Sequence, residues 1–361
     1  MISRRALLAG AGATAGTGAA RASDAPTLAG SARSAGLLYG ASIDDAAFAH
    51  PAYEALYAGE TAIVATDVAF KFDWLRPAPD RFDWSRADRI VDWAAKNGKA
   101  VRGHCLIWND NAPDWLRRLS GREVERVFDA HLEAVAARYS GRVALWDVVN
   151  EPFWPMAGLK GGWRDGPWFA AMGPGYVARA FRRVAAADPS AKLALNEAQC
   201  DNEREGWGPA IRGPLARLVD DLLHVGAKLD VIGLQSHLRP QWPHDWPAFA
   251  HYVDAFGGRG LDVHLSEFDV DDSGFPDEVT ARDAAVATAT GEFLRAALSS
   301  PATKAVVNWQ LSDRFTWYRD LWRRSHPASA RTPRPLPFDD RYAPAPMRSA
   351  MLAAFAAKGR G

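Results

Sequence analysis

Short hydrophobic segments alternate with amphipathic stretches along the chain from about residue 36 onward. The hydrophobic segments are rich in Val, Ile and Leu and lack a strict alternation with polar residues. This pattern is typical of strands that are buried on both faces of a sheet. We expect eight such strands, at residues 36–43, 61–70, 99–108, 142–150, 192–197, 229–238, 261–270 and 304–313.

The amphipathic stretches between these strands carry helical signatures. In residues 122–141, apolar side chains recur every three or four positions, and Gly141 follows as a stop. Residues 85–99 begin with Ser85 as the expected N-cap. Three further helices are expected, at residues 213–227, 282–298 and 344–358.

Eight buried strands, most of them followed by a helix, predict an α/β fold of the (β/α)8 TIM barrel type. The alternative is an open doubly wound sheet, which requires a glycine-rich phosphate turn after an early strand. No such turn follows residues 36–43 or 61–70. The sequence therefore favours a single catalytic barrel domain over residues 36–361, in which the Pro- and Arg-rich residues 323–340 form a long loop.

The N-terminal residues are predicted to be an export signal rather than part of the fold. A twin arginine, Arg4-Arg5, precedes a short apolar stretch that ends in small residues near Ala22. We expect residues 1–22 to be a twin-arginine signal peptide and residues 23–35 to be a linker. The mature protein is then expected in the periplasm or outside the cell.

Composition narrows the choice of partners. The 43 basic residues balance the 43 acidic ones, which argues against nucleic acid or an acidic lipid surface, because both call for a basic excess. No apolar run is long enough to cross a membrane. The 15 tryptophans fit either a filled core or a cleft lined with indole faces for sugars. Cys105 and Cys200 could pair, but two cysteines do not make a disulfide framework.

Polar side chains follow or end most of the predicted strands. In a TIM barrel the chemistry lies at the carboxyl ends of the strands, and Lys71 follows the second strand there. The other residues at these ends are His104 and Trp108, Asn150 and Glu151, Asn196 and Glu197, Gln235 and His237, Glu267 and Asp269, and Trp309 and Gln310. Six polar endings on one rim are more than helix caps and surface ion pairs explain, so we interpret the rim as a functional site.

A metal centre is one interpretation of this rim, since His104, His237, Glu151 and Glu267 could gather around one ion. Closely spaced ligand pairs such as His-x-His are absent, however, and we expect neither a metal nor another cofactor. Two carboxylates from the fourth and seventh strands, in a cleft with Trp, Asn, Gln and His, instead equip the rim to cleave a glycosidic bond. One carboxyl group is then protonated and the other ionised.

Several motifs resemble those of glycoside hydrolase family 10, the endo-β-1,4-xylanases. They are "RGHCLIW" (102–108), "WDVVNEPF" (146–153), "GLQSHL" (233–238), "LSEFDV" (265–270), the run from Trp309 through Asp313 to Trp317, and "LPFDDRYAPAP" (336–346). The motifs occur in the family's order, and the resemblance covers residues 38–356. It implies a (β/α)8 barrel that acts on xylan or xylooligosaccharides.

The resemblance also implies a role for each matched residue. Glu151 would be the general acid and then the base, and Glu267 the nucleophile of a retaining double displacement. Asn150 would bind the 2-hydroxyl of the sugar at the cleavage point. His237 would orient Glu267, with Asp269 behind it. The remaining sugar-binding residues would be Lys71, His104, Gln235, Trp108, Trp309 and Trp317.

Three places depart from the family pattern. Asp67 and Val68 stand where Glu and Asn usually grip the second sugar on the glycone side, and Val68 has no side-chain donor or acceptor. Asn109 stands where a histidine often follows the tryptophan, and residues 196–198 differ from the usual Asn-Asp-Tyr. We expect a monomeric, retaining endo-1,4-β-xylanase. The alternatives are a β-glycosidase of this family for a different or decorated glycan, and a catalytically weak carbohydrate-binding relative.

Overall fold

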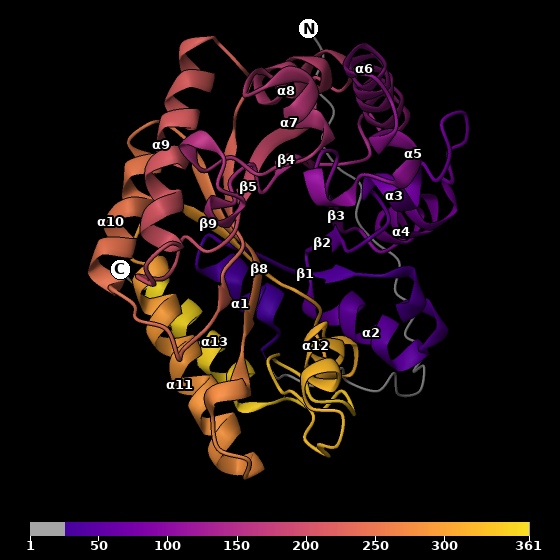
Figure 1. Cartoon of the computed structure of the whole chain (residues 1–361). Coiled ribbons are helices and arrows are strands. Elements are labelled where there is room, and N and C mark those ends of the chain that lie inside the picture. Colours follow the sequence, from indigo (N-terminus) through magenta and orange to yellow (C-terminus); the bar gives the residue numbers. More distant parts are fainter. Residues whose placement is uncertain (1–25, 361) are drawn as a thin grey trace, which may run out of the picture.

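The protein folds around a closed barrel of parallel strands inside a ring of helices (Figure 1). This description rests on a computed structural model and covers residues 26–360. The expected signal peptide at 1–22 lies outside the described residues. Within residues 26–360, no helix is long and apolar enough to cross a membrane.

The barrel contains all eight predicted strands. They are β1 (Leu38–Ile43), β2 (Ile63–Thr66), β3 (Ala100–Gly103), β4 (Leu145–Asn150), β5 (Lys192–Glu197), β6 (Val231–Leu234), β8 (Asp262–Val270) and β9 (Thr303–Asn308). Neighbours pair in the order β6-β5-β4-β3-β2-β1-β9-β8, and a β6–β8 pairing closes the barrel. The prediction of a TIM barrel is confirmed. The predicted strand at 229–238 is split after Leu234, and its end forms a separate two-residue strand, β7 (His237–Leu238), which pairs with β8.

Strand packing requires a glycine at position 40. Gly40 of β1 pairs in register with Ile63 of β2. A Cβ atom on Gly40 would lie 2.0 Å from the carbonyl oxygen of Ile63, so no larger residue fits without moving the backbone.

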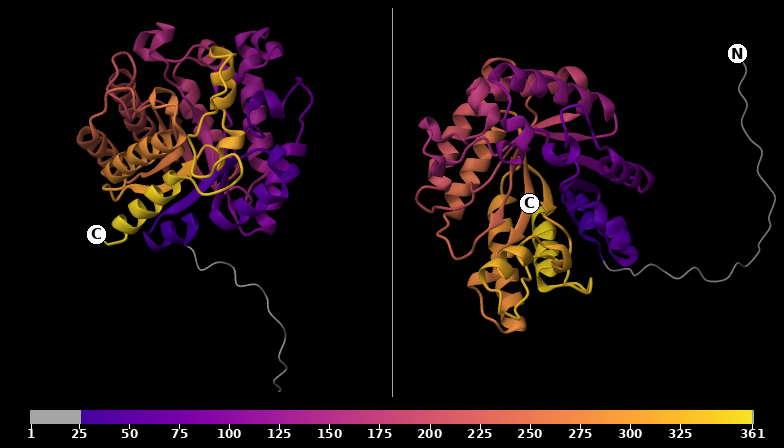
Figure 2. Two further views of the ribbon diagram at one scale, coloured as in Figure 1. Left: turned by 90° about the horizontal axis from the view of Figure 1, so that it is seen from below. Right: turned by 45° about the vertical axis from the view of Figure 1, so that its right-hand side comes forward.

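Helices surround the barrel and connect its strands (Figures 1 and 2). The α-helices are α1 (Leu28–Ser34), α2 (Pro51–Glu60), α3 (Phe72–Leu75), α4 (Ser85–Lys96), α5 (Asp114–Arg117), α6 (Gly121–Arg138), α7 (Pro167–Met172), α8 (Gly175–Ala187), α9 (Gly208–His224), α10 (Trp246–Gly257), α11 (Val279–Ala297), α12 (Tyr318–Ser325) and α13 (Pro346–Lys358). Short 3-10 helices are η1 (Asp45–Ala49), η2 (Asn109–Asn111), η3 (Pro155–Ala157), η4 (Lys160–Gly162), η5 (Asp272–Gly274) and η6 (Asp313–Phe315). The five helices expected from periodicity all form, with ends that differ by a few residues.

Three local expectations differ from the structure. Ser85 is the first residue of α4 rather than its cap, and its amide and hydroxyl both donate to Asp83 Oδ1. Helix α12 runs to Ser325, so the loop expected at 323–340 begins after it. The described part of the expected linker at 23–35 contains helix α1, which packs onto the barrel.

Helix α1 is held by burial and by one hydrogen bond. Leu28 and Ala32 are fully buried, and the amide of Leu28 donates to Glu60 Oε2 at 2.7 Å. Thr27 caps the helix through its side-chain oxygen. Helices α1 and α13, at opposite ends of the described chain, pack against each other (Figure 2). Apolar burial therefore draws this segment into the fold.

The two cysteines lie in the interior as free thiols. Cys105 and Cys200 are both buried, and neither is part of a disulfide. The pairing of these two cysteines, which the sequence left open, therefore does not occur in this structure. Stability in residues 26–360 comes from the packed core around the barrel wall.

Candidate active site

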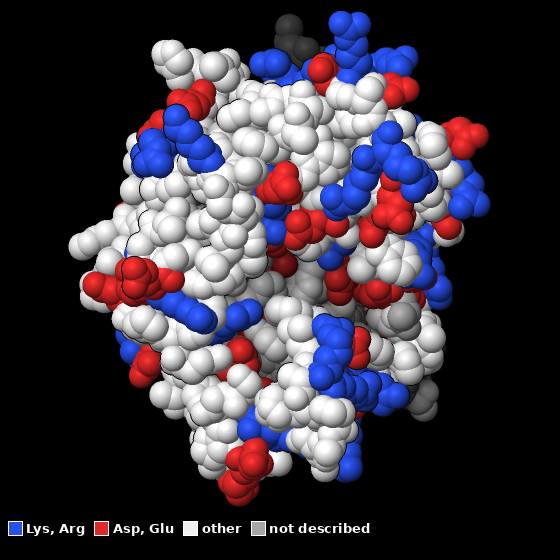
Figure 3. All heavy atoms as spheres, viewed as in Figure 1, with Lys and Arg blue, Asp and Glu red and all other residues white. Residues whose placement is uncertain are grey.

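The carboxyl ends of the barrel strands gather the predicted site residues on one rim. Glu151 follows β4, Gln235 follows β6 and Trp309 follows β9, while Glu267 lies within β8. The barrel strands are parallel, so their carboxyl ends all lie on the same side of the barrel. The side chains at these ends therefore lie close together. The face of the molecule seen in Figure 3 is hollowed near its centre, where acidic side chains gather.

Glu267 is buried in the site. It is 5 % exposed, and its Oε1 accepts a hydrogen bond of 2.7 Å from Asn196 Nδ2. Its Oε2 is 3.3 Å from His237 Nε2, and His104 Nδ1 lies 3.9 Å from Oε1. Burial alone raises the pKa of a carboxyl group, but His104, His237 and Lys71 outweigh it and lower the pKa of Glu267. Glu267 is therefore held in its ionised form.

The two histidines beside Glu267 are each backed by an aspartate. His237 Nδ1 lies 2.9 Å from Asp269 Oδ1, and His104 Nδ1 lies 3.0 Å from Asp147 Oδ2. Burial opposes a charged imidazole, yet Asp269 and Glu267 raise the pKa of His237 to about 10. Burial opposes the charge on His104 too, but Cys105, Glu267 and Asp147 outweigh it and raise the pKa of His104 to about 10. Both imidazoles are thus cations at neutral pH.

Asp269 and Asp147 are themselves anchored. Trp317 Nε1 and Tyr318 Oη donate to Asp269 at 2.8 and 3.2 Å. Arg102 Nε donates to Asp147 Oδ2 at 2.8 Å from inside the barrel. Burial raises the pKa of Asp147, but Arg102 and His104 outweigh it and lower that pKa. Charge therefore alternates from Arg102 through Asp147 and His104 to Glu267.

Glu151 has different surroundings. Its backbone adopts a φ of 49°, which is uncommon outside glycine, and its side chain is 13 % exposed. Oε1 accepts from Gln235 Nε2 at 2.8 Å and more weakly from Asn150 Nδ2 at 3.4 Å. Oε2 accepts from Arg164 Nη2 at 2.5 Å. Glu151 thus lies at the mouth of the barrel, where solvent can reach it.

A chain of amide hydrogen bonds connects the two carboxylates. Gln235 Nε2 reaches both Glu151 Oε1 and, at 3.3 Å, Asn150 Oδ1. Asn196 Nδ2 donates to Asn150 Oδ1 at 2.8 Å and to Glu267 Oε1 at 2.7 Å. Three amide side chains thereby fix the position of Glu151 relative to Glu267.

The tryptophans line the side of the site near Lys71. Lys71 Nζ lies 5.3 Å from the centre of the Trp108 ring and 5.8 Å from that of Trp309. The Trp309 ring lies 5.0 Å from the His104 ring, and the Trp317 ring lies 5.1 Å from that of His237. All eleven predicted site residues therefore belong to one connected cluster.

A small cavity lies at Asp67, one of the altered positions. It has a volume of about 170 Å³ and is lined by Asp44, Ala47, Asp67, Gln310 and Phe315. Gln310 Nε2 donates to Asp67 Oδ2 at 2.7 Å, and Tyr53 donates to Gln310 Oε1 at 3.0 Å. Asp67 thus keeps a defined polar position, whereas its neighbour Val68 offers no side-chain hydrogen bond.

Sequence reasoning assigned no role to four residues of the site, Asn196, Asp147, Arg102 and Arg164. Asn196 was seen at a strand end without a role, and Asp147 and Arg102 lie inside the quoted motifs "WDVVNEPF" and "RGHCLIW". A polar residue in an apolar strand is a signal that could have found those three. Arg164 lies in a loop beyond β4, and no sequence pattern points to it.

Glu197, which ends β5, is fully buried behind Glu151. It accepts hydrogen bonds from the amides of Phe153 and Ala198 at 3.1 and 2.8 Å. Burial, and next the charge of Glu151, raise the pKa of Glu197 well above its usual range. Burial therefore favours the neutral form of Glu197, whose two hydrogen bonds support the loop after Glu151.

The metal interpretation finds no support in the geometry. Within residues 26–360, no three or more His, Cys, Asp or Glu side chains are grouped so that they could hold an ion. His104 and His237 are each committed to carboxylates instead.

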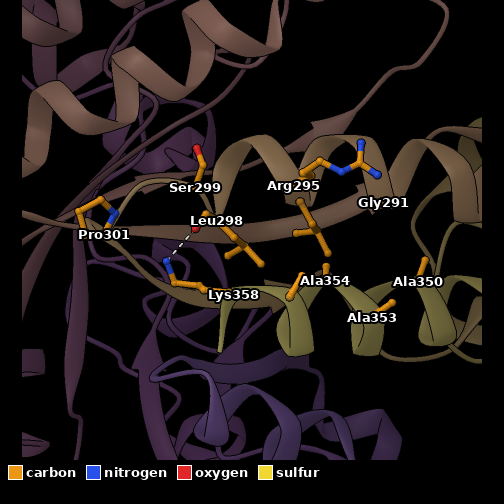
Figure 4. Close-up of a pocket in the computed structure, with 11 residues that line it drawn as sticks. Gly291, Arg295, Leu298, Ser299, Pro301, Ala350, Ala353, Ala354 and Lys358 are labelled. Carbon is orange, nitrogen blue, oxygen red and sulfur yellow. Dashed lines mark hydrogen bonds between the residues drawn. The ribbon is translucent and has the colours of Figure 1, made fainter. Parts of the chain in front are cut away.

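A larger groove lies on the outer wall of the barrel (Figure 4). It has a volume of about 690 Å³ and lies between α11 and α13. Its lining includes small side chains such as Ala353 and Ala354, and Lys358 Nζ donates to the carbonyl of Leu298 at 2.7 Å. None of the predicted site residues lines it, so the chemistry of the rim does not extend there.

Comparison with known proteins places these features in context. Residues 27–354 match the family model described as "Glycosyl hydrolase family 10". A β-1,4-xylanase of Dictyoglomus thermophilum is 30% identical over 289 residues, 76% of each chain. Endo-1,4-beta-xylanase A of Xylanibacter ruminicola is 32% identical over 213 residues, 57% of this chain and 55% of that protein.

Solved structures show the same architecture. Xylanase 10B from Thermotoga petrophila RKU-1, solved with xylobiose, superposes with a TM-score of 0.82 at 24% identity, over 94% of this chain and 99% of that one. Xylanase B from Clostridium stercorarium F9 superposes with a TM-score of 0.78 at 27% identity, over 91% and 99% of the two chains.

Proposed function

Because the chain belongs to glycosyl hydrolase family 10, we propose that it is an endo-1,4-β-xylanase that cleaves internal linkages of xylan with retention of configuration. The observation that carries the proposal is the pair of carboxylates in unlike surroundings, Glu151 and Glu267, connected by Asn150, Asn196 and Gln235. A retaining hydrolase needs one carboxylate that attacks and a second that transfers protons.

In the first step, Glu267 is the nucleophile. Its ionised oxygen forms a bond to the anomeric carbon while the bond to the leaving sugar oxygen breaks. Glu151, in its protonated form, gives its proton to that oxygen, so the leaving sugar departs as an alcohol. Charged His104 and His237 keep Glu267 ionised before the attack.

In the second step, Glu151 acts as the base. It takes a proton from a water molecule, whose oxygen attacks the anomeric carbon and displaces Glu267 as a carboxylate. The two inversions together retain the configuration. Asn150, fixed between Asn196 and Gln235, is placed to bind the sugar 2-hydroxyl as positive charge develops on the ring.

The proposal is tested by digesting defined xylooligosaccharides and following the products by proton NMR. We expect internal cleavage and a first-formed product in the β configuration. A first-formed α product would contradict the retaining mechanism, and intact xylooligosaccharides would contradict the activity.

A second candidate is a retaining β-glycosidase for a different or decorated β-linked glycan. Val68 favours it, because this residue removes a polar contact that the family usually offers to the second glycone sugar. A panel of polysaccharides and aryl β-glycosides separates the two candidates. Faster cleavage of another glycan than of xylan would favour the second.

We further propose that the enzyme is exported by the twin-arginine route and acts as a monomer. The Arg4-Arg5 pair and the small residues near Ala22 support export. Fusion of residues 1–22 to a reporter without its own signal tests it: an Arg4→Lys, Arg5→Lys double variant should keep the reporter inside the cell. Light scattering during gel filtration tests the monomer.

A further inference from the structure

Arg164 holds Glu151 at two points. Its Nη2 donates to Glu151 Oε2 at 2.5 Å, and its Nε donates to the carbonyl oxygen of Glu151 at 2.8 Å. Its Nη1 donates to Asp110 Oδ2 at 2.5 Å. The guanidinium carbon lies 4.6 Å from the centre of the Trp154 ring, and the residue is only 5 % exposed. Such a buried, fully engaged arginine has a fixed position.

The loop after β4 folds back to bring Arg164 to this place. Phe153 and Trp163 form an antiparallel bridge, and the amide of Arg164 donates to the carbonyl of Pro152 at 2.8 Å. Gly161 and Gly162 allow the return because both adopt a positive φ. Arg164 therefore lies opposite Pro152, the residue that follows Glu151, although Arg164 and Glu151 are 13 positions apart in sequence.

The contacts of Glu151 are those of an ionised carboxylate. Its Oε1 faces the amide donors of Gln235 and Asn150, and its Oε2 faces Arg164. Donors on both oxygens suit the base that the second step requires. The first step requires the protonated acid instead, so the strength of the Arg164 contact bears on the balance between the two steps.

The guanidinium of Arg164 forms a second ion pair, with Asp110. The Asp110 carboxylate is 49 % exposed and contacts Nη1 of the guanidinium, whereas Glu151 contacts Nη2. Asp110, Glu151, Trp154, Arg164 and Asp165 line a common cavity of about 330 Å³. A guanidinium bound to two carboxylates stabilises each of them less than it would stabilise one alone.

We propose that Arg164, shared with Asp110, is a positioning residue that stabilises the ionised form of Glu151 and thereby favours the second catalytic step over the first. This inference rests on the proposed function, because it assumes that Glu151 serves as acid and base. Within residues 26–360, Arg164 is the one cation within 4 Å of the Glu151 carboxylate.

Other titratable groups also face this carboxylate and remain in every variant. Glu197 of β5 lies behind it, and Asp165 lines the same cavity. Glu267 lies across the site and is accompanied by the cations His104, His237 and Lys71. Since these groups are constant, a shift caused by replacing Arg164 reports on Arg164.

Two substrates separate the steps. Hydrolysis of xylotetraose requires the acid, so the alkaline limb of its kcat/KM profile follows the loss of the Glu151 proton. With 2,4-dinitrophenyl β-xylobioside, the first step needs no acid, and the second step limits kcat. The second step needs Glu151 in its ionised form, so the acid limb of the kcat profile follows the loss of the Glu151 proton. We expect Arg164→Gln to move both limbs to higher pH by about one unit.

The rate of the second step should also fall. We expect kcat of Arg164→Gln on the dinitrophenyl substrate to drop about tenfold, a part of what general base catalysis contributes. Arg164→Lys keeps the charge and should restore both limbs to near wild type. Arg179→Gln is the matched control, because it removes an arginine that pairs with Asp129 on the outer helices and should leave both limbs in place.

Asp110→Asn should shift the pH profiles in the opposite direction, because Glu151 is then the only carboxylate that pairs with Arg164. We expect both limbs to move to lower pH. Profiles of Arg164→Gln that superimpose on the wild type, with only a lower kcat or a higher KM, would overturn the proposal, as would an upward shift in Asp110→Asn. Failure of the proposed function is recognised separately, because the wild-type enzyme would then leave xylotetraose intact.

Discussion

The two carboxylates of the site are held by different parts of the molecule. Glu267 lies within strand β8, and the groups that surround it come from barrel strands or the residues directly after them. Glu151 follows the end of β4, has a positive φ, and depends on Arg164 from a loop. The barrel thus builds the proposed nucleophile, whereas a loop completes the proposed acid and base.

This difference matches what each role requires. A nucleophile must stay ionised throughout, and the alternating charges of Arg102, Asp147 and His104 support that state from inside the barrel. An acid and base must change its protonation twice in each cycle, which suits a carboxylate near solvent. Variants that affect one carboxylate and not the other test this division.

The largest expected effect separates the two carboxylates directly. Glu267→Ala should lower activity at least about 10⁴-fold on every substrate, because no nucleophile remains. Glu151→Ala should lower hydrolysis of xylotetraose about 10³-fold but keep a fast first release of dinitrophenol from the aryl xylobioside, which needs no acid. Initial burst and steady-state rates measure both.

Azide provides the check on that prediction. It attacks without a base, so it should restore turnover of Glu151→Ala and give a β-xylobiosyl azide. The same β product from Glu267→Ala would reverse the assignment of the two residues. Glu205→Ala, an exposed carboxylate in the loop before α9, is the control and should retain wild-type rates.

A smaller effect is expected from His237. Its positive charge, with a pKa of about 10, contributes to the lowered pKa of Glu267. His237→Asn should raise the pKa of Glu267 and move the acid limb of kcat/KM to higher pH by about one unit. The alkaline limb should stay in place, because it follows Glu151.

Profiles of kcat/KM for xylotetraose over pH test this prediction. His251→Asn replaces an exposed histidine of α10 and is the control. If His237→Asn moved the alkaline limb instead, the separation between the two carboxylates would be wrong.

The same comparison explains what the sequence could and could not predict. Gln235, Glu267 and the pair Asn150-Glu151 lie on or next to barrel strands, so the identification of the strands already placed them on one rim. Arg164 is positioned by the return of a loop through Gly161 and Gly162. Its contact with Glu151 depends on turn conformations that spacing does not reveal.

Other differences have the same origin. Helix α1 lies where a linker was expected, because the burial of Leu28 and Ala32 depends on tertiary packing rather than on a long periodic pattern. Ser85 resembles a cap, but Asp83 accepts the hydrogen bonds that order this turn. Local signals identified the elements, and packing decided their ends.

Stability should also depend on pH through the Glu267 region. The pKa of His237 and of His104 is about 10 in the fold, against about 6.5 in an unfolded chain. Their stabilisation is fully present below pH 6.5 and is lost as the pH rises toward 10. Burial lowers the pKa of His131 and of His264 to about 3, so the contribution of these two is present above pH 6.5 and lost as the pH falls toward 3.

Thermal unfolding of the wild type and of His237→Asn measures the first of these contributions. We expect the wild type to be the more stable at pH 6 and the difference in Tm to shrink by about 2 °C or more by pH 9.5. His251→Asn should show a constant difference over the same range. A Tm difference for His237→Asn that grew with pH would contradict a charged imidazole beside Glu267.

The smallest expected effect lies outside both carboxylates, at the altered glycone position. Val68→Asn should return a hydrogen bond to the second glycone sugar, which corresponds to a roughly two- to tenfold gain in kcat/KM. The gain should appear with an aryl β-xylobioside, which reaches that position, and not with an aryl β-xyloside, which does not. Val225→Asn, at an exposed valine after α9, controls for added polarity. Equal changes on both substrates would show that residue 68 acts on the catalytic centre itself, whereas a gain on the xylobioside alone would confine its effect to binding one sugar away from Glu267.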